Sequence, residues 1–234
     1  RNDENPSNLM LSGQEMNLST WAICKLNMFL HGVRGADIRK GDTLGDPQHV
    51  ENGEIMRFDR VIANPPFSLK NWGQDLAEDD RYGRCRFGVP PKSSGDFAFI
   101  QHMISSLNNE GVMGVIVPPG VLFRGGAEEK IRTGIIKDDL IEAVIGLPFG
   151  LLYGTQIPPV LLIINKKKSI KRQGKVLFID ASHDFEKNKW INILRNETIS
   201  KIVRCFEEFK EIDSYSIKEQ NSTQEGTLVS KVVP

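Results

Sequence analysis

Residues 58–67 read Phe-Asp-Arg-Val-Ile-Ala-Asn-Pro-Pro-Phe, and this stretch decides the fold that we expect for the chain. Its first six residues form a short, largely apolar run of strand length, and the next four are rigid. Each proline fixes φ and removes a backbone N–H, and the residue before each proline is held extended. The pattern predicts a strand with a ligand site at its carboxyl end, which is where open α/β sheets bind ligands.

The tetrapeptide Asn64-Pro65-Pro66-Phe67 combines two hydrogen-bond acceptors with an aromatic ring. The Asn64 side-chain oxygen and the Pro65 carbonyl could accept both hydrogens of a planar amino group, while Phe67 could stack on the heterocycle that carries it. Such an amine is a poor nucleophile because its lone pair is delocalised, so catalysis would depend on positioning and charge complementarity. The alternative is a proline-stiffened turn that only ends a strand.

Strands alternate with helices along the chain, which favours an α/β fold with a mainly parallel sheet. We expect strands at residues 9–13, 36–39, 58–63, 112–117 and 140–147, and helices at about 19–30, 96–107, 128–137 and 197–212. Residues 160–165 and 175–179 are interpreted as a pair of strands at an antiparallel edge, joined by a basic turn. We expect this turn to be a solvated tip, with phosphate contact as the alternative. Residues 68–93 form a long polar loop, a type of segment that is usually functional or mobile.

Composition indicates one sizeable globular domain, with 39% hydrophobic and 26% charged residues among 234. The net charge of zero does not decide whether nucleic acid is a partner, because a local basic patch or another subunit could contact phosphates. Three cysteines without paired spacing indicate free thiols in a cytoplasmic protein, and we expect no metal site. The sequence contains no run of 18 apolar residues, so we predict no membrane span.

Residues 58–68 resemble the catalytic motif of N6-adenine DNA methyltransferases, and further blocks resemble the modification subunit of type I restriction–modification systems. These blocks follow the family's order over about residues 10–205: Gly13–Asn17, Asn27–Gly32, Gly41–Leu44, Phe87–Ser94, Gly120–Ala127, Leu147–Pro148 and Lys175–Ser182. The resemblance implies a Rossmann-like class I fold, with S-adenosylmethionine as methyl donor. It also implies transfer to adenine N6 in duplex DNA, with the target base flipped out of the helix.

The resemblance implies four catalytic and two cofactor-binding residues: Asn64, Pro65, Pro66 and Phe67, then Glu15 and Asp42. In a complete nucleotide-binding α/β sheet, an acidic side chain at the end of the second strand can accept from ribose hydroxyls. In the family's fold, Glu15 would have this position. The alternative for Glu15 is a surface residue that starts a helix. Asp42 could accept from the adenine amino group of the cofactor, or it could close an Asx-turn.

Other candidate residues have two interpretations each. The stretch 87–94 could form a lip over the target base, or Ser93 or Ser94 could cap the helix that begins at Asp96. His102 is interpreted as a packed residue of that helix, with a catalytic role as the alternative. Residues 124–126 could hold an anion on backbone N–H groups or form a glycine turn, and residues 149–156 are expected to shape a loop near the target pocket.

The family's glycine-rich turn, which holds the methionine part of the cofactor, has no match before Leu9. We therefore expect an internal fragment that lacks the first strand and the glycine-rich motif, with residues 1–212 as a partial methyltransferase domain and residues 213–234 as a polar C-terminal tail. The absent strand would lie between the strands that end at Glu15 and Asn64, so both should expose unpaired edges and apolar faces. Another chain, a swapped element or a shifted strand pairing should fill the gap.

The resemblance also implies the partners, namely duplex DNA, a specificity subunit, a restriction subunit and a second modification subunit, in the prokaryotic cytoplasm and without a membrane. For this chain alone we expect weak or absent binding of S-adenosylmethionine. Two alternatives stay open. One is a catalytically inactive module that assembles with a specificity subunit, and the other is a methyltransferase for a different acceptor, such as a protein glutamine.

Overall fold

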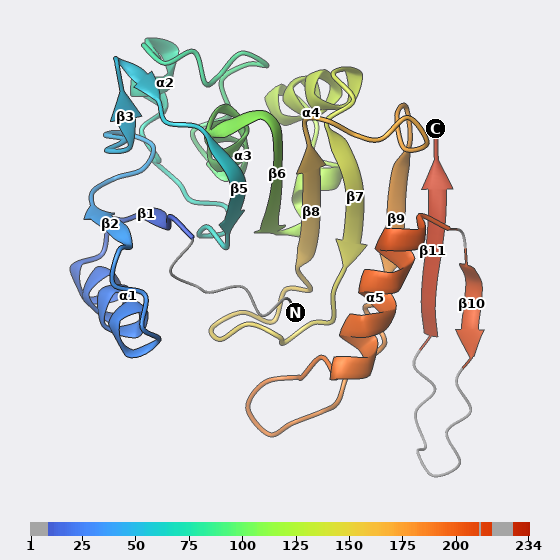
Figure 1. Cartoon of the computed structure of the whole chain (residues 1–234). Coiled ribbons are helices and arrows are strands. Elements are labelled where there is room, and N and C mark those ends of the chain that lie inside the picture. The colour runs from blue at the N-terminus through green and yellow to red at the C-terminus, as the bar shows by residue number, and fades with distance from the viewer. Residues whose placement is uncertain (1–8, 211, 217–226) are drawn as a thin grey trace.

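The computed structural model describes residues 9–210, 212–216 and 227–234, which form a seven-stranded sheet, a two-stranded sheet and a short hairpin (Figure 1). The strands are β1 (Ser12–Glu15), β2 (Asp37–Lys40), β3 (Val50–Glu51), β4 (Glu54–Ile55), β5 (Phe58–Ala63), β6 (Leu107–Val117), β7 (Ile141–Gly146), β8 (Val160–Asn165), β9 (Val176–Asp180), β10 (Ile212–Ser216) and β11 (Thr227–Val233). The helices are α1 (Leu18–Leu30), α2 (Gln74–Glu78), α3 (Asp96–Ser105), α4 (Ala127–Lys137) and α5 (Asn196–Glu208), with a 3₁₀ turn at Pro119–Leu122.

The expected elements are present, with boundaries that differ by a few residues. The run Phe58–Ala63 is strand β5, and the helical periodicity after residue 96 is α3. Helix α1 begins one residue earlier than the sequence suggested, because the side chain of Asn17 accepts the N–H of Thr20 at 3.1 Å and caps the helix. The α/β class that the sequence predicts is confirmed.

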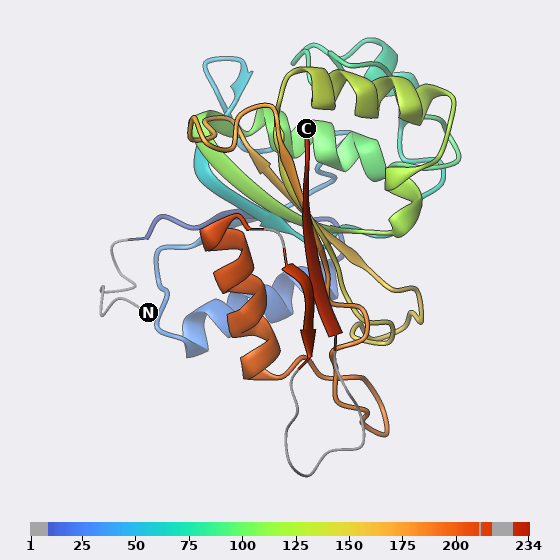
Figure 2. The ribbon, with the colours of Figure 1, turned by 90° about the vertical axis from the view of Figure 1, so that its right-hand side faces the viewer.

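The seven-stranded sheet is mixed, in the order β10-β11-β9-β7-β8-β6-β5. Strands β5 and β6 pair in parallel, as do β7 and β9, and β8 runs antiparallel between β6 and β7. Helices α3 and α4 pack on one face, around Phe97, Ile100 and Ile131, and α5 packs on the other, around Ile179 and Ile202 (Figure 2). Two apolar layers therefore enclose the centre of the sheet.

The expected antiparallel pair of residues 160–165 and 175–179 is wrong, because β8 does not pair with β9. Strand β8 inserts between β6 and β7, and β9 pairs in parallel with β7. The physical reason is the composition of β8, which is apolar on both faces. Leu162 and Ile164 are buried against the α3 side, while Leu161 and Ile163 pack on the α5 side. A central position removes both faces from water.

The basic turn after β8 is only partly the solvated tip that we expected, because Lys167, Lys171 and Lys175 are exposed whereas Lys166 and Lys168 bond to the protein. The side chain of Lys168 is buried, and its Nζ donates to Asp139 at 2.6 Å and to the carbonyl oxygen of Lys175 at 2.9 Å. Lys166 Nζ donates to the carbonyl oxygen of Leu107 at 2.7 Å. These bonds fasten the turn to the starts of β6 and β7, so these two lysines have structural partners.

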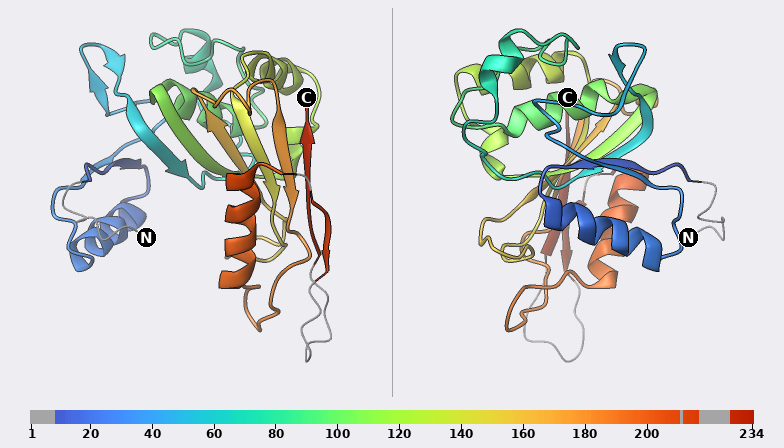
Figure 3. Two further views of the ribbon diagram at one scale, coloured as in Figure 1. Left: turned by 45° about the vertical axis from the view of Figure 1, so that its right-hand side comes forward. Right: turned by 90° about the vertical axis from the view of Figure 1, so that its left-hand side faces the viewer.

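The sheet is interrupted between β1 and β5. Strands β1 and β2 pair only with each other, in parallel, from Ser12 opposite Asp37 to Glu15 opposite Lys40. Within the described residues, no strand lies between β1 and β5, and Figure 3 shows β1, β2 and α1 apart from the seven-stranded sheet. Ile62 of β5 is 87% exposed, and no residue of α1 is buried.

This interruption confirms the expected unpaired edges and exposed apolar groups on both sides of the gap. The shifted pairing that could have closed the gap is not seen, since β1 and β5 do not pair. Filling of the gap by another chain or by a swapped element stays a prediction.

Residues 213–234 differ from the polar tail that we expected wherever the structure describes them. Strand β11 pairs with β9, with Val229 opposite Asp180, and β10 pairs with β11 at the edge of the sheet. The side chain of Leu228 is 2% exposed and packs in the α5 layer. The apolar edge of β9 accounts for this extension, and residues 217–226 lie outside the described residues. None of the helices in the described part is long and apolar enough to cross a bilayer.

The unpaired outer edge of β5 predicts the pattern of amide hydrogen exchange along this strand. Its backbone groups bond to β6 on one side only, so alternate amides of residues 58–63 should exchange at nearly unprotected rates, whereas those of β6 should be protected on both sides. Residue-resolved exchange measured by NMR tests this. Uniform protection along β5 would show that its outer edge is paired.

Candidate active site

Besides β10, four strands end at one edge of the seven-stranded sheet. Because β5 is parallel to β6, β7 to β9, and β8 is antiparallel to both β6 and β7, the carboxyl ends of β5, β6, β7 and β9 share that edge. Asn64 follows β5 there. The loops after β7 and β9 lie at the same edge, so residues far apart in the sequence can serve one site.

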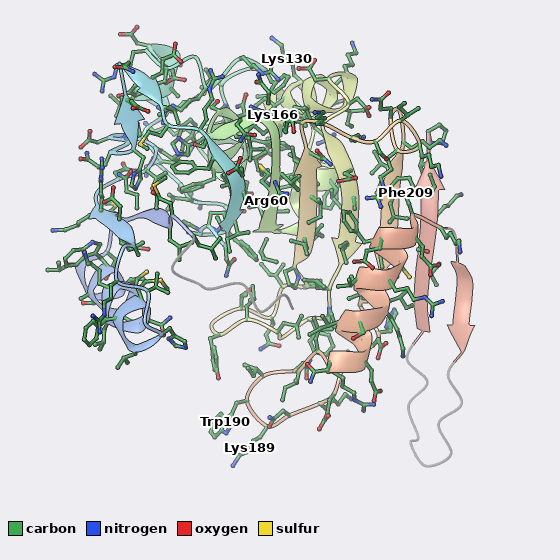
Figure 4. All side chains as sticks on the ribbon, viewed as in Figure 1. Arg60, Lys130, Lys166, Lys189, Trp190 and Phe209 are labelled. Carbon is green, nitrogen blue, oxygen red and sulfur yellow. The ribbon has the colours of Figure 1, made fainter. Side chains whose placement is uncertain are left out.

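A cleft of about 560 Å³ separates β1 from β5. Five of the six site residues that the sequence suggested line it: Glu15, Asp42, Asn64, Pro65 and Pro66. Phe67, the sixth, is half-buried and is not part of the lining. The cleft thus joins the end of β1, the loop after β2 and the end of β5, and Arg60 of β5, labelled in Figure 4, also lines it.

The two acceptors at the end of β5 are available to a ligand. The side chain of Asn64 is exposed, and Pro65 is half-buried. Among the residues that the structure describes, none donates a hydrogen bond to the Asn64 side-chain oxygen or to the Pro65 carbonyl. Both oxygens can therefore accept from a bound amino group without breaking a contact within the protein.

Glu15 and Asp42 line the cleft, and each also makes the local structural contact that the sequence offered as its alternative role. One carboxylate oxygen of Glu15 accepts the N–H of Asn17 at 2.6 Å, at the start of α1. Oδ1 of Asp42 accepts the N–H of Leu44 at 3.0 Å, which is an Asx-turn. Each carboxylate keeps a second oxygen with no hydrogen-bond partner in the described part of the chain, so the local role does not exclude a ligand.

Gln14 and His49, which sequence reasoning missed, fix the positions of Glu15 and Asp42 relative to each other. Gln14 donates to the carbonyl oxygen of Asp46 at 2.8 Å and accepts the N–H of Gln48 at 2.9 Å. Nε2 of His49 lies 2.9 Å from the carbonyl oxygen of Gly13. These bonds fasten the loop after β2 to β1. The sequence indicates this role only weakly, because Gln14 and His49 are polar residues that lie close to Glu15 and Asp42 in the chain.

His102 of α3 also lines the cleft, and it is packed as the sequence suggested. Burial, together with the positive charge of Arg84, lowers the pKa of His102 from 6.5 to about 4. Arg84 Nη1 lies 3.4 Å from His102 Nδ1 and is oriented by Asp80, whose Oδ1 accepts from its Nε at 2.9 Å. The imidazole is therefore neutral near pH 7.

Ser94 and Arg124, near the tetrapeptide, have contacts that the sequence interpretations did not include, whereas Gly126 fits the glycine turn. Helix α3 is capped by Gly95 without a side-chain bond, so capping by Ser93 or Ser94 is wrong. Instead, Ser94 Oγ lies 3.1 Å from Asp96 and 2.9 Å from Glu128. The Arg124 side chain binds both carboxylates, and Gly126 caps α4. The lip over a target base and an anion at residues 124–126 stay untested.

Exposed aromatic residues occur in the loops at the carboxyl edge. Tyr153, after β7, is 83% exposed, and Trp190, after β9, is 78% exposed. The Lys189 ammonium lies 5.1 Å from the centre of the Trp190 ring, and Figure 4 shows both at the outer end of their loop. Phe149 contacts Phe185 edge to face, with centroids 5.3 Å apart, which joins the two loops. Among the described side chains, no group of three or more histidine, cysteine, aspartate and glutamate residues forms a metal site.

Known proteins match this chain over most of its length. The family model described as N-6 DNA Methylase matches residues 1–224. The MjaVII methylase subunit of a type I restriction enzyme from Methanocaldococcus jannaschii is 39% identical over 219 residues, which are 89% of this chain and 37% of that protein. The crystal structure of a type I restriction–modification methyltransferase subunit from Streptococcus thermophilus matches with a TM-score of 0.80 and 36% identity, over 89% of this chain and 44% of that chain.

A Listeria monocytogenes protein described as a class I S-adenosylmethionine-dependent methyltransferase has the same fold, with a TM-score of 0.61 and 19% identity, over 86% of this chain and 55% of that chain. The fold and the cleft define the class, a class I S-adenosylmethionine-dependent methyltransferase fold. The chain belongs to the N-6 DNA methylase family. It spans 37% of the length of the M. jannaschii relative.

The lowered pKa of His102 predicts a pH dependence of stability. The unfolded chain binds a proton on this residue near pH 6.5, and the folded chain binds it only near pH 4, so the unfolded state holds more protons in between. Stability should therefore fall as the pH drops from 6.5 toward 4. Between pH 7.5 and pH 5, urea unfolding should show about 2 kcal/mol more loss for the wild type than for His102→Gln.

The exposed His183 supplies the control, since His183→Gln should lose stability with pH as the wild type does. Equal pH dependence in His102→Gln and the wild type would contradict the buried, neutral imidazole.

Proposed function

We propose that this chain carries the acceptor half of the active site of an adenine-specific DNA methyltransferase, in the modification subunit of a type I restriction–modification system. One observation supports this most directly. The Asn64 side-chain oxygen and the Pro65 carbonyl have no partner within the described residues, and they line the same cleft as Glu15 and Asp42. Residues 1–212 would form the partial catalytic domain, with β10 and β11 extending its sheet.

Asn64 and Pro65 would bind the target adenine through its amino group. Accepting both N6 hydrogens pulls the nitrogen toward a pyramidal geometry and returns its lone pair from the ring, which makes it a nucleophile at the moment of transfer. Pro65 and Pro66 limit backbone movement, so the two acceptors are preorganised. Phe67 is half-buried, and the accessible part of its ring would stack on the flipped base.

Glu15 and Asp42 fit the nucleoside part of S-adenosylmethionine, which supplies an activated methyl group when it is bound. The free carboxylate oxygen of Glu15 would accept from the ribose hydroxyls, and that of Asp42 from the adenine amino group. The methionine part would need groups supplied by a strand in the gap between β1 and β5. Without them we expect this chain alone to bind the donor weakly.

The carboxyl edge of the sheet is the face that we propose for duplex DNA. Tyr153, Trp190 and Lys189 are exposed there, and aromatic and cationic side chains suit stacking and phosphate contact. The chain carries no net charge, so a specificity subunit would supply much of the affinity for DNA. A second modification subunit and a restriction subunit would belong to the same complex. We place this complex in the prokaryotic cytoplasm.

An assembly module without catalysis is the second candidate function. The open edge of β5 and helix α1, none of whose residues is fully buried, favour it, because both are surfaces that an assembly would cover. Binding to a specificity subunit, measured beside methylation, separates the two functions. An assembly module binds the subunit and transfers no methyl group in any complex that contains it.

Substitution of Asn64 tests the acceptor role. In the assembled enzyme, Asn64→Ala should lower the methylation rate constant by about 100-fold or more, because one of two preorganised acceptors is lost, while affinity for DNA should stay within about twofold. Transfer of tritiated methyl groups and a gel-shift titration measure the two quantities. Asn109 is exposed at the opposite edge, so Asn109→Ala is the matched control and should keep full activity. Activity retained in Asn64→Ala would refute the proposed role.

Substitution of Glu15 tests donor binding separately from structure. Glu15→Gln keeps an oxygen that accepts the N–H of Asn17, so the start of α1 should be unaffected. Loss of the charge should raise KM for S-adenosylmethionine about tenfold, because a hydrogen bond to a charged group is lost. The exposed Glu51 provides the control substitution Glu51→Gln. An unchanged KM in Glu15→Gln would leave Glu15 with only its local contact.

A further inference from the structure

A buried charged cluster includes Ser68, the residue that directly follows the Asn64–Phe67 tetrapeptide. It comprises Ser68, Ser94, Asp96, Arg124 and Glu128, from the loop after β5, the start of α3, the turn after β6 and the start of α4. Asp96 and Glu128 are each 2% exposed. Burying two carboxylates is costly unless each is paired and hydrogen-bonded, so a cluster of this kind needs a reason in the fold or in the chemistry.

Asp96 connects the cluster to the catalytic loop. Its Oδ1 accepts the backbone N–H of Ser68 at 2.7 Å, and its Oδ2 lies 3.1 Å from Ser94 Oγ and 3.4 Å from Ser68 Oγ. Oδ2 also accepts from the guanidinium of Arg124. One carboxylate therefore holds the residue that directly follows Phe67, and an ion pair holds that carboxylate.

Arg124 bridges the two carboxylates and is itself held from several sides. Its Nη2 and Nε bind Glu128, with one Nη2–Oε1 distance of 3.0 Å, and these bonds together with those to Asp96 raise its pKa. The guanidinium lies against Gly120, where a Cβ atom would collide with Nη1, so glycine leaves room for the side chain of Arg124. Arg132 Nη1 donates to the carbonyl oxygen of Arg124 at 2.9 Å. Hydrogen bonds thus hold both the side chain and the backbone carbonyl of Arg124.

The cluster completes a two-ended anchor for the tetrapeptide. At one end, Ala63 pairs with Val115 of β6. At the other, Ser68 has a φ of 50°, which is unfavourable for an L-residue, and the bond to Asp96 offsets that cost. The N–H of Gly95 bonds to the carbonyl oxygen of Leu69 at 2.9 Å, which extends the attachment. Four residues, two of them proline, span the distance between the anchors.

We propose that Asp96 and Arg124 are positioning residues, which rests on the proposed function. They act through Ser68 to fix the direction of the Asn64 and Pro65 acceptors toward the target amine. A misplacement of reacting groups by about 1 Å can cost about 100-fold in rate, so a fixed loop matters for catalysis even though neither residue lines the cleft. Glu128 and Ser94 hold Arg124 and Asp96 in place.

Two substitutions test the proposal in the assembled enzyme. Asp96→Asn keeps the size of the side chain and removes the charge that Arg124 binds, and Arg124→Met removes the bridge. Both should raise the exchange rate of the Ser68 amide about tenfold or more and lower kcat about 10- to 100-fold. KM for S-adenosylmethionine should stay within about twofold, because neither residue lies on the donor side of the cleft. Arg124→Lys keeps the charge and should recover part of kcat.

Arg86 supplies a matched control, since its exposed ion pair with Asp138 at 2.8 Å lies elsewhere on the surface. Arg86→Met should change neither Ser68 exchange nor kcat. If Asp96→Asn or Arg124→Met does not fold, as judged by circular dichroism, Ser94→Ala decides, because it removes one hydroxyl bond and should show a smaller change in the same two readouts. Unchanged Ser68 exchange and kcat in the folded variants overturns the proposal.

Asn64→Ala separates this proposal from the proposed function. It should abolish methylation while Ser68 exchange stays at the wild-type rate. Full activity in Asn64→Ala would refute the function whatever Asp96 does. Loss of activity in Asn64→Ala, combined with wild-type kcat in Asp96→Asn, would refute the positioning role alone.

Discussion

The candidate site depends on a short connection that is fixed at both of its ends. Strand pairing fixes Ala63, and the carboxylate of Asp96 fixes Ser68 through a 2.7 Å hydrogen bond. Between them, two prolines remove two φ rotations and two N–H groups. The Asn64 side-chain oxygen and the Pro65 carbonyl are left without hydrogen-bond partners in the described residues. A stiff loop of this kind can present acceptors to a weak nucleophile without having to reorganise first.

The second constraint is the interruption of the sheet. The cleft that contains Glu15, Asp42 and Asn64 is bounded by two strands whose facing edges are unpaired in the described structure. The proposed acceptor side of the reaction is held by β5, β6, α3 and α4, which all belong to the larger sheet and its helices. The proposed donor side consists of β1, β2 and α1, which pair and pack little with the larger sheet. Donor binding should therefore respond to whatever fills the gap, while the acceptor geometry should not.

Local patterns predicted the elements well and their neighbours less well. The apolar run before Asn64 and the periodicity after Asp96 identified β5 and α3, because these signals are short-range. The run Val160–Asn165 was recognised as a strand, but its two apolar faces suit several positions in a sheet, and its central place depends on contacts with β6 and β7. The cluster of Asp96, Arg124 and Glu128 was not predicted, although residues 124–126 were singled out, because its central contact joins Arg124 to Asp96 across 28 positions of the chain.

The central claim is that Asn64 and Pro65 bind the amino group of the target adenine. A structure of the assembled enzyme on DNA that contains its target sequence tests this claim most directly. With the target adenine outside the helix, N6 should lie about 2.7–3.2 Å from both the Asn64 side-chain oxygen and the Pro65 carbonyl oxygen, with Ser68 still bonded to Asp96. An extrahelical adenine whose amino group is bound by other residues, away from the end of β5, would contradict the account.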